Sequence, residues 1–412
     1  MSNDSTQRHA NYSPKALFLI AGAALLLVIA REPKFLLEPR IWGEEGTIYI
    51  QQFLSNGWLS GLFSPALGYY SLVANFSAVF SVALVGLQWA AFVTTAISLT
   101  LYLICILAPL FLRSVYWSGL GARATLIAFT IIVSSPEIWL NTINVHFYLG
   151  LFACYVLLSD TEQLSPRLFI FVSLVLAVGA LTSGTTVILA PLFIAKFLYA
   201  KRQGWCERAV QRNFLQAVIL SLGLGIQVLA KIFSVDDELP RLSIDYFQYL
   251  PLGLMRTFFY GFSENPNTIS MVFSVLTAVA ACSAFVVLKR ARAVLLLALY
   301  VGVVYTLLSL GMMGGGRYAF IPTVLLVLYG VNLFANLPWP LARYTLVAAG
   351  AAFFIYRTPL YFDTQRFYQD DWLSFSEEYA RALESGESEV RVFPQWQEID
   401  WRISLPEQSA SK

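Results

Sequence analysis

The chain has 412 residues, of which 58% are hydrophobic and 13% charged, and its formal net charge is +2. This balance lies far outside the averages for soluble globular proteins, and no stripe of basic residues points to nucleic acid as a partner. Apolar runs of about 17–25 residues recur, each long enough to cross the hydrocarbon core of a bilayer. The sequence therefore predicts an all-α polytopic membrane protein.

The N-terminal region predicts a short cytoplasmic tail, residues 1–14, followed by a membrane anchor. An apolar run extends from Ala16 to Ala30, and its last three residues are similar to a signal-peptidase site. Because a charged segment beginning at Arg31 follows directly, we expect an uncleaved signal anchor.

Eleven segments are expected to span the membrane. The stretch 166–200 is nearly continuous, and we expect a tight turn at Leu181-Thr182-Ser183-Gly184, because glycine, serine and threonine interrupt the apolar run there. The segments are 15–31, 88–112, 122–138, 145–159, 166–182, 184–200, 212–232, 269–288, 293–311, 318–336 and 341–357.

Loop charges predict the orientation of these spans. The loop from Lys201 to Arg212 and the Lys-Arg-Ala-Arg sequence at 289–292 are basic, and short basic loops stay in the cytoplasm. The N-terminus falls on the same side, so we expect a cytoplasmic N-terminus and a periplasmic C-terminus. Three long segments then lie outside: 31–87, 233–268 and 358–412.

Two surface helices are expected in the first external segment. Residues 69–87 are apolar enough to span, but a span there would place the basic loops outside. We therefore interpret 69–87 as an interfacial or re-entrant helix, with Asn75, Ser77 and Ser81 off its apolar face. Apolar residues at helical spacing predict a second surface helix over 47–66.

The first external segment also holds the strongest candidate for chemistry, between Glu38 and Gly46. It places the adjacent carboxylates of Glu44 and Glu45 near Arg40 and Trp42, at the mouth of the first membrane helix. An equally good interpretation from the pattern alone is that these acids only solvate the end of a loop.

A histidine and an arginine mark two further external turns. His146 lies in the turn 141–148, and a lone histidine is more often structural than catalytic. Arg317 follows the glycine-rich stretch 311–316 and stands at the head of a membrane helix. An arginine there usually has an anionic partner, and a guanidinium can bind phosphate in a fork. The alternative is an arginine that snorkels to lipid headgroups.

The external segment 233–268 interleaves charged and aromatic residues, and we expect it to lie on the membrane or to line a cavity. Its Asp236-Asp237-Glu238 run has oxygen ligands for a divalent cation, although a solvated acidic turn is the commoner explanation. The four cysteines have neither metal-ligand spacing nor a disulfide pattern. We therefore expect no cofactor, and dependence on a metal is unsupported.

Residues 358–412 are expected to form a small external appendage, too small to bury a large core. Ser374 to Glu384 predicts a short amphipathic helix, and residues 390–394 predict a short extended piece. The last residues, from Pro406 to Lys412, are expected to be disordered.

Four short motifs in this order resemble the GT-C superfamily of polytopic glycosyltransferases, which use polyprenyl-phosphate-linked sugars. Bacterial members of this type read Trp-x-Glu-Asp-Gly in the first loop, and the resemblance covers residues 15–357. The departure is Glu45, which stands where the pattern has aspartate and adds one methylene. The motifs here are Trp42-Gly43-Glu44-Glu45-Gly46, Gly68-Tyr69, Asn144-Val145-His146-Phe147 and Gly316-Arg317-Tyr318.

The resemblance implies a bacterial inner-membrane enzyme that transfers a sugar, with inversion, to a glycan, lipid or protein acceptor on the periplasmic face. A carboxylate must take the acceptor's proton, and Glu45, or else Glu44, is expected in that role. Fixed positive charge must stabilise the departing polyprenyl phosphate, and Arg317, with Arg256 or Arg40, is expected to supply it. The residues expected to contact substrate are His146, Asn144, Tyr318 and Trp42.

Two other classes remain open at this point. A flippase or transporter for a lipid-linked glycan would also need phosphate-binding arginines, but it should carry charges near the bilayer midplane. The expected spans are nearly free of charge, since Glu137 and Lys196 lie close to span ends. A non-catalytic membrane subunit, in which the acids are only structural, is the third interpretation.

Overall fold

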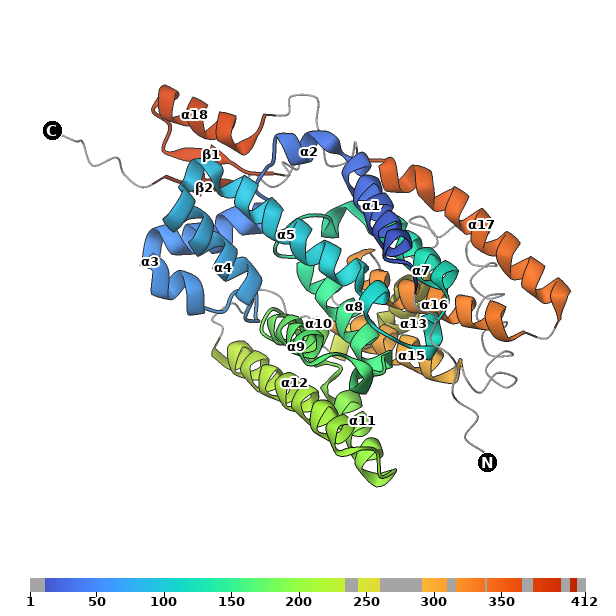
Figure 1. Cartoon of the computed structure of the whole chain (residues 1–412). Coiled ribbons are helices and arrows are strands. Elements are labelled where there is room, and N and C mark those ends of the chain that lie inside the picture. The colour runs from blue at the N-terminus through green and yellow to red at the C-terminus, as the bar shows by residue number, and fades with distance from the viewer. Residues whose placement is uncertain are drawn as a thin grey trace.

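The computed structural model describes residues 12–233, 244–259, 291–309, 316–337, 339–364, 373–393 and 401–405. Over these ranges the secondary structure is almost entirely helical, and the sheet consists of two short antiparallel strands (Figure 1). The all-α class predicted from the apolar runs is therefore confirmed. The predictions on 234–243, 269–288 and 311–315, and on both ends of the chain, lie outside the described residues.

The first span leads into a group of short helices. Helix α1 (Pro14–Arg31) is followed by α2 (Pro33–Leu37), and the chain then turns at 38–44 into the π-helix η1. The helices that follow are η1 (Glu45–Ile50), α3 (Gln51–Phe63), α4 (Leu72–Phe80) and η2 (Ser81–Val85).

The centre of the molecule is α8 (Val145–Leu158). Its residues from Val145 to Val156 are all buried, because α5, α9, α10 and α16 pack around it. A helix that is apolar on every side suits this position. The helices before it are η3 (Leu87–Trp89), α5 (Ala90–Ile106), α6 (Ala108–Phe111), η4 (Val115–Trp117), α7 (Leu120–Ile132) and η5 (Pro136–Ile138).

The predicted break near Leu181 is confirmed. Helix α9 (Pro166–Ala180) ends just before it, and the Ser183 side chain accepts a hydrogen bond that starts α10 (Gly184–Val187). The short η6 (Thr161–Gln163) precedes α9, and α11 (Ala190–Arg202) and α12 (Glu207–Phe233) form a long antiparallel pair beyond α10.

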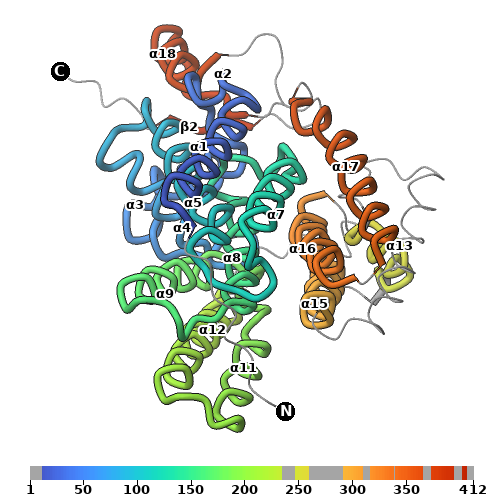
Figure 2. Tube along the Cα trace, turned by 45° about the vertical axis from the view of Figure 1, so that its right-hand side comes forward, coloured from blue at the N-terminus to red at the C-terminus, as the bar shows by residue number. Residues whose placement is uncertain are grey.

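The second half adds η7 (Ile244–Tyr249), α13 (Leu250–Phe259), α15 (Arg292–Leu308), η9 (Gly316–Ala319), α16 (Phe320–Asn336) and α17 (Pro340–Phe362). Helices α13, α15 and α16 pack against one another, and Figure 2 shows them on one side of the molecule. The C-terminal segment holds α18 (Phe375–Ser385), β1 (Glu389–Arg391) and β2 (Arg402–Ser404). The predicted amphipathic helix is confirmed, with Ser374 and Glu377 forming a capping box.

Among the described residues, five helical stretches are long and apolar enough to cross a membrane: Pro14–Arg31, Leu87–Ile106, Gly184–Arg202, Glu207–Phe233 and Gly316–Asn336. Helices also lie over the other described segments in which spans were expected, but they are shorter or less apolar. The protein is therefore a helical membrane protein, and the predicted total of eleven spans is not established.

Several helices present apolar side chains to the outside. Only 17% of α1 is buried, and α12 leaves large apolar residues such as Leu222, Leu229 and Phe233 exposed. Water would penalise these surfaces, whereas lipid tails match them. The exposed faces therefore support a membrane as the surroundings of these helices.

Loops that are far apart in the sequence gather at the two ends of the molecule. The Phe375 amide donates to the Pro39 carbonyl, so the C-terminal segment and the first loop lie together. The Tyr12 hydroxyl bonds to the Ser118 carbonyl, so the N-terminal end of α1 meets the loop before α7. Figures 1 and 2 both place the α11–α12 turn at the end of the molecule opposite α18.

The interpretation of 69–87 as a surface helix needs one correction. The segment forms α4 and η2, which pack on α3 and end at Gly86, where φ is +101°. The polar residues expected off the apolar face are instead buried, and the Asn75 amide donates to the carbonyls of Leu62 and Ser64. The helix turns its polar side inward because α3 offers backbone acceptors there, and Phe76 and Leu84 face outward.

Candidate functional site

Glu45 is buried at the start of η1, with a relative exposure of 3%. One carboxylate oxygen accepts from the Trp42 amide at 3.0 Å, and the other accepts short hydrogen bonds from the amide and the hydroxyl of Thr142. Burial raises the pKa of Glu45, and the Thr142 and Trp42 bonds oppose that rise. The carboxyl group therefore ties the first loop to the turn before α8.

Glu44 has different surroundings, although it is the adjacent residue. It is only half-buried, and in the described part of the chain its carboxylate makes no hydrogen bond or ion pair. It lies within electrostatic range of Tyr49 and of Arg317. Of the two acids, Glu44 is therefore the one with oxygens available to a ligand.

Arg317 faces these acids from η9, at the head of α16. Its Nη1 lies 2.9 Å from an oxygen of Glu137 and donates to the Asn144 side-chain oxygen at 3.3 Å. Both charged side chains of the ion pair remain partly exposed, at 19% and 32%. The pair therefore combines a fixed geometry with access for a further anionic group at the remaining N–H donors.

The side chains of two asparagines hold the turn before α8. The side chains of Asn141 and Asn144 both donate to the Glu137 backbone carbonyl, at 2.8 and 3.0 Å. The backbone N–H of Asn144 donates to the side-chain oxygen of Asn141. Side chains of this type satisfy backbone groups that a helix or strand does not. This network fixes Glu137, Thr142 and Asn144 in place beside the first loop and η9.

Aromatic rings complete the cluster. The ring of Tyr69 packs edge-on against His146, with centroids 6.1 Å apart, and Tyr69 lies within electrostatic range of Arg317. The His146 Nδ1 is 2.6 Å from the Ile143 carbonyl, so that nitrogen carries the proton and donates. Tyr318 packs against Phe147 with centroids 5.6 Å apart.

The four short motifs, which are far apart in the sequence, thus meet at one end of the helical core. The cluster consists of Glu44, Glu45, Tyr69, Glu137, Asn144, His146 and Arg317. We refer to these seven residues as the acid–arginine cluster. It combines a free carboxylate, a paired carboxylate and a guanidinium within one partly enclosed place.

The other expected site residues are placed differently. Arg40 lies over the ring of Phe393, and Trp42 packs edge-on against the same ring at 5.8 Å. Arg256 is a half-buried residue of α13, a helix that packs beside η9, but no described contact brings Arg256 to the acid–arginine cluster. Arg40 and Trp42 therefore connect the first loop to the C-terminal segment.

That segment is part of the site's framework rather than a separate appendage. The Phe393 amide donates to the Ile41 carbonyl at 2.9 Å, and the Ser404 amide donates to the Gln51 side chain at 2.7 Å. A Cβ added at Gly43 would lie 2.9 Å from the Trp401 ring, and one at Gly46 would lie 2.9 Å from Val392 and Ile403. Glycine on each side of the two acids thus permits close packing.

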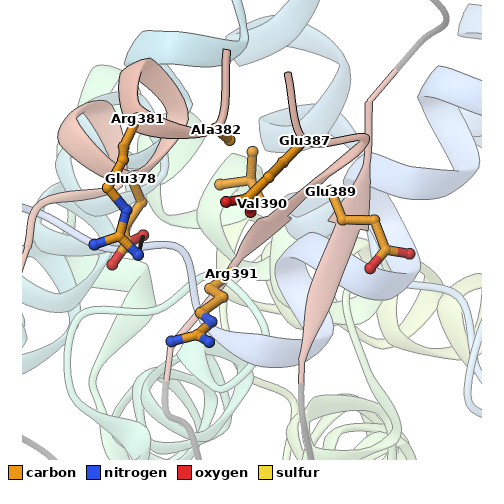
Figure 3. A pocket seen from close by; sticks show the side chains of 7 residues that line it. All are labelled: Glu378, Arg381, Ala382, Glu387, Glu389, Val390 and Arg391. Carbon is orange, nitrogen blue, oxygen red and sulfur yellow. Dashed lines mark ion pairs between the residues drawn. The ribbon is translucent and has the colours of Figure 1, made fainter. Parts of the chain in front are cut away.

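On its outer side the C-terminal segment has a shallow hollow between α18 and the strands (Figure 3). Three acids and two arginines line it, and Glu378 and Arg381 form an ion pair of 3.5 Å across one turn of α18. The mixed charge gives the hollow no preference for one ligand class. It lies apart from the two acids of the first loop.

Two polar residues at the site, Glu137 and Thr142, escaped the sequence analysis as functional residues. Glu137 and Thr142 were passed over because an acid at a span end and a threonine in a turn are common. Their signal was the group of polar residues among 137–144, which interrupts two apolar segments.

Metal ligands do not gather in the described part of the chain, where no group of three or more His, Cys, Asp or Glu side chains could hold a metal ion. The acidic run 236–238 lies outside the described residues. The chemistry open to the acid–arginine cluster is therefore proton transfer by a carboxylate and anion binding by a guanidinium.

The fold and the cluster together define a helical membrane protein with a polar, partly enclosed site at one end of its helices. Comparison with protein-family models and with curated proteins gives no match.

Proposed function

We propose that the protein is a membrane glycosyltransferase of the GT-C type, which transfers a sugar from a polyprenyl phosphate to an acceptor hydroxyl. The observation that supports this most is the meeting of the four resembling motifs in the acid–arginine cluster. Chemistry of this kind needs a carboxylate and a cation on opposite sides of one reacting carbon, and Glu44 and Arg317 offer that pair.

In the proposed reaction, Glu44 accepts the proton of the acceptor hydroxyl. The acceptor oxygen forms a bond to the anomeric carbon from one face. The bond from that carbon to the phosphate oxygen breaks on the opposite face, and its electron pair leaves with the polyprenyl phosphate. The configuration at the anomeric carbon is inverted. The positive charge of Arg317 stabilises the departing phosphate.

This proposal moves the role of base from Glu45 to Glu44. A base must lie within hydrogen-bond reach of the proton that it takes, and the oxygens of Glu45 are buried and already occupied by Trp42 and Thr142. Glu45 then positions the loop that carries Glu44. His146 and Asn144 border the donor phosphate in this arrangement, and Arg256 and Arg40 have no assigned contact with it.

The surroundings of the site suit a lipid-linked donor. Helices α3, α4 and η2 leave Trp58, Phe63, Phe76 and Leu84 exposed beside the first loop. Such apolar surface next to a polar site fits a polyprenyl chain that lies in the membrane. In the orientation predicted from loop charges, the site opens on the periplasmic face of a bacterial inner membrane.

The deciding experiment measures the product that every such reaction shares. Purified protein in lipid vesicles is incubated with a panel of polyprenyl-phosphate sugars and a membrane extract as acceptor, and released polyprenyl phosphate is quantified. The proposal expects release with one donor, and its loss in Glu44→Gln protein that folds normally. If the wild-type protein releases nothing, but moves a lipid-linked glycan between leaflets, the proposal fails in favour of a flippase.

A comparison in cells identifies the product. The glycan linkages of envelope polymers and glycoproteins are compared between cells with the wild-type chain and cells with Glu44→Gln. Loss of one specific sugar branch at a normal protein level names the acceptor class. Unchanged glycans in that comparison would support a non-catalytic subunit.

A further inference from the structure

Arg31, the last residue of α1, has an unusual environment. It is 3% exposed, and its guanidinium lies 4.3 Å from the centroid of the Tyr361 ring and 5.3 Å from that of Trp139. All three guanidinium nitrogens are buried, and none has a hydrogen-bond partner. Among the described residues no carboxylate lies within ion-pair distance of Arg31.

Two other buried arginines, Arg123 and Arg212, donate hydrogen bonds to backbone carbonyls. Arg123 donates to the carbonyls of Trp117 and Leu110, and Arg212 donates to three carbonyls around η6. A buried cation without such partners is strongly unfavourable, because it loses its hydration and regains little from aromatic faces. The difference at Arg31 therefore points to a partner outside the chain.

The polar groups beside Arg31 narrow the chemistry of that partner. The Trp139 indole N–H is buried without an acceptor. The buried Tyr102 hydroxyl lies within electrostatic range of Arg31 and interacts with Ser134. The nearby Ser134 hydroxyl is already bonded to Tyr148 at 2.6 Å. Arginine and tryptophan side chains only donate hydrogen bonds, so the missing partner must accept them.

We propose that Arg31 and Trp139 form, beside Tyr102, a buried binding site for a small monovalent anion of the size of chloride. One guanidinium balances one negative charge, and no second cation is needed. The low exposure of Arg31 and the aromatic rings beside it suit a compact ion. The site is distinct from the acid–arginine cluster and does not depend on the proposed function.

The position of this anion gives it a structural consequence for the nearby turn. Trp139 belongs to the same turn as Glu137 and Asn141, which support the acid–arginine cluster. The ring of Phe35 in α2 packs against the Trp139 ring, with centroids 5.4 Å apart. Tyr361 belongs to α17, and its hydroxyl bonds to the Leu27 carbonyl of α1. An anion at Arg31 therefore joins α1, α17 and the turn before α8.

The test measures thermal unfolding of the full-length protein in detergent while chloride replaces gluconate at constant ionic strength. Binding of an ion to the folded state alone raises the midpoint in a saturable manner, by about 2 °C when chloride exceeds its dissociation constant tenfold. Arg31→Gln is expected to abolish this rise. Arg212→Gln is the matched control: it lowers the midpoint by removing a carbonyl-bonded buried arginine, but it keeps the chloride response.

A structure determined with bromide in place of chloride supplies the second measurement. Anomalous scattering beside the guanidinium of Arg31 is expected, and it remains informative where Arg31→Gln protein does not fold. The proposal is overturned if chloride does not stabilise the wild-type protein and no bromide is found at Arg31. It is also overturned if the chloride response survives in Arg31→Gln, because the ion then binds elsewhere.

Discussion

Two adjacent glutamates in the first loop show how strongly local surroundings separate similar residues. Glu45 is enclosed and accepts three hydrogen bonds, whereas Glu44 is half-buried and has no described partner. A sequence pattern cannot distinguish them, because they are adjacent residues of the same type and both closely follow Trp42. Their substitution should therefore have different consequences.

We expect Glu44→Gln to abolish donor turnover while the protein keeps its stability, because only a base without structural bonds is lost. Glu45→Gln should lower the free energy of unfolding by about 1–3 kcal/mol, because the amide cannot accept from both Trp42 and Thr142. Thermal unfolding and polyprenyl-phosphate release measure the two effects. Normal turnover in a folded Glu44→Gln protein would remove Glu44 from the role of base.

The raised pKa of Glu45 makes the stability of the fold depend on pH. Burial raises its folded-state pKa above the ordinary value, so Glu45 stabilises the fold fully at pH values below its unfolded pKa. This contribution is lost as the pH rises from the unfolded pKa through the folded one. Unfolding midpoints of the wild-type protein and of Glu45→Gln, measured across that window, should converge as the pH rises. Parallel curves would contradict the assignment.

Arg317 and Glu137 allow a test of phosphate binding. Arg317→Lys keeps the charge but loses the planar fork, and we expect donor binding to weaken by about tenfold or more. Glu137→Gln removes the competing counter-charge, so donor binding should tighten, while the Glu137 carbonyl bonds to Asn141 and Asn144 stay intact. Binding is measured with a polyprenyl-phosphate analogue. Weaker binding in Glu137→Gln would show that the ion pair itself forms the donor site.

At the scale of elements, the C-terminal segment and the first loop fold as one unit. Two backbone hydrogen bonds join them, and Phe375, Val390, Phe393 and Ile403 are buried in their contact. The sequence predicted α18 and the extended piece correctly, because capping and alternation are local signals. It gave no sign that these elements hold the loop with the two acids, because that contact joins residues more than 300 positions apart.

We expect Gly46→Ala to disturb this unit, because the added methyl group would press on Val392 and Ile403 at 2.9 Å. A cost of about 1–3 kcal/mol and faster proteolysis of the C-terminal segment should follow. Gly121→Ala is the matched control, since this glycine of α7 has open space around it and alanine favours a helix. If both variants resist proteolysis equally, the segment does not depend on the close approach at Gly46.

At the scale of the whole molecule, the predicted sidedness is open to a direct measurement. Glu384→Cys places a thiol on the exposed side of α18, and the native Cys206 is exposed in the α11–α12 turn at the other end. A maleimide that cannot cross membranes should label Glu384→Cys in spheroplasts, and Cys206 only after the membrane is opened. Cys105 and Cys154 are buried and contribute little background. Equal labelling of both positions in intact spheroplasts would contradict the orientation.

The sequence by itself determined the membrane class, the approximate positions of several long helices and the short motifs, because hydropathy, capping residues and turn residues act over a few neighbouring positions. It left the number of spans open, because short apolar helices such as α8 owe their burial to the helices around them. Only the tertiary structure decided which carboxylate is free, which acid pairs with Arg317 and where Arg31 lies. These properties depend on contacts between distant segments, and the cost of burying a charge can be judged only when every neighbour of that charge is known.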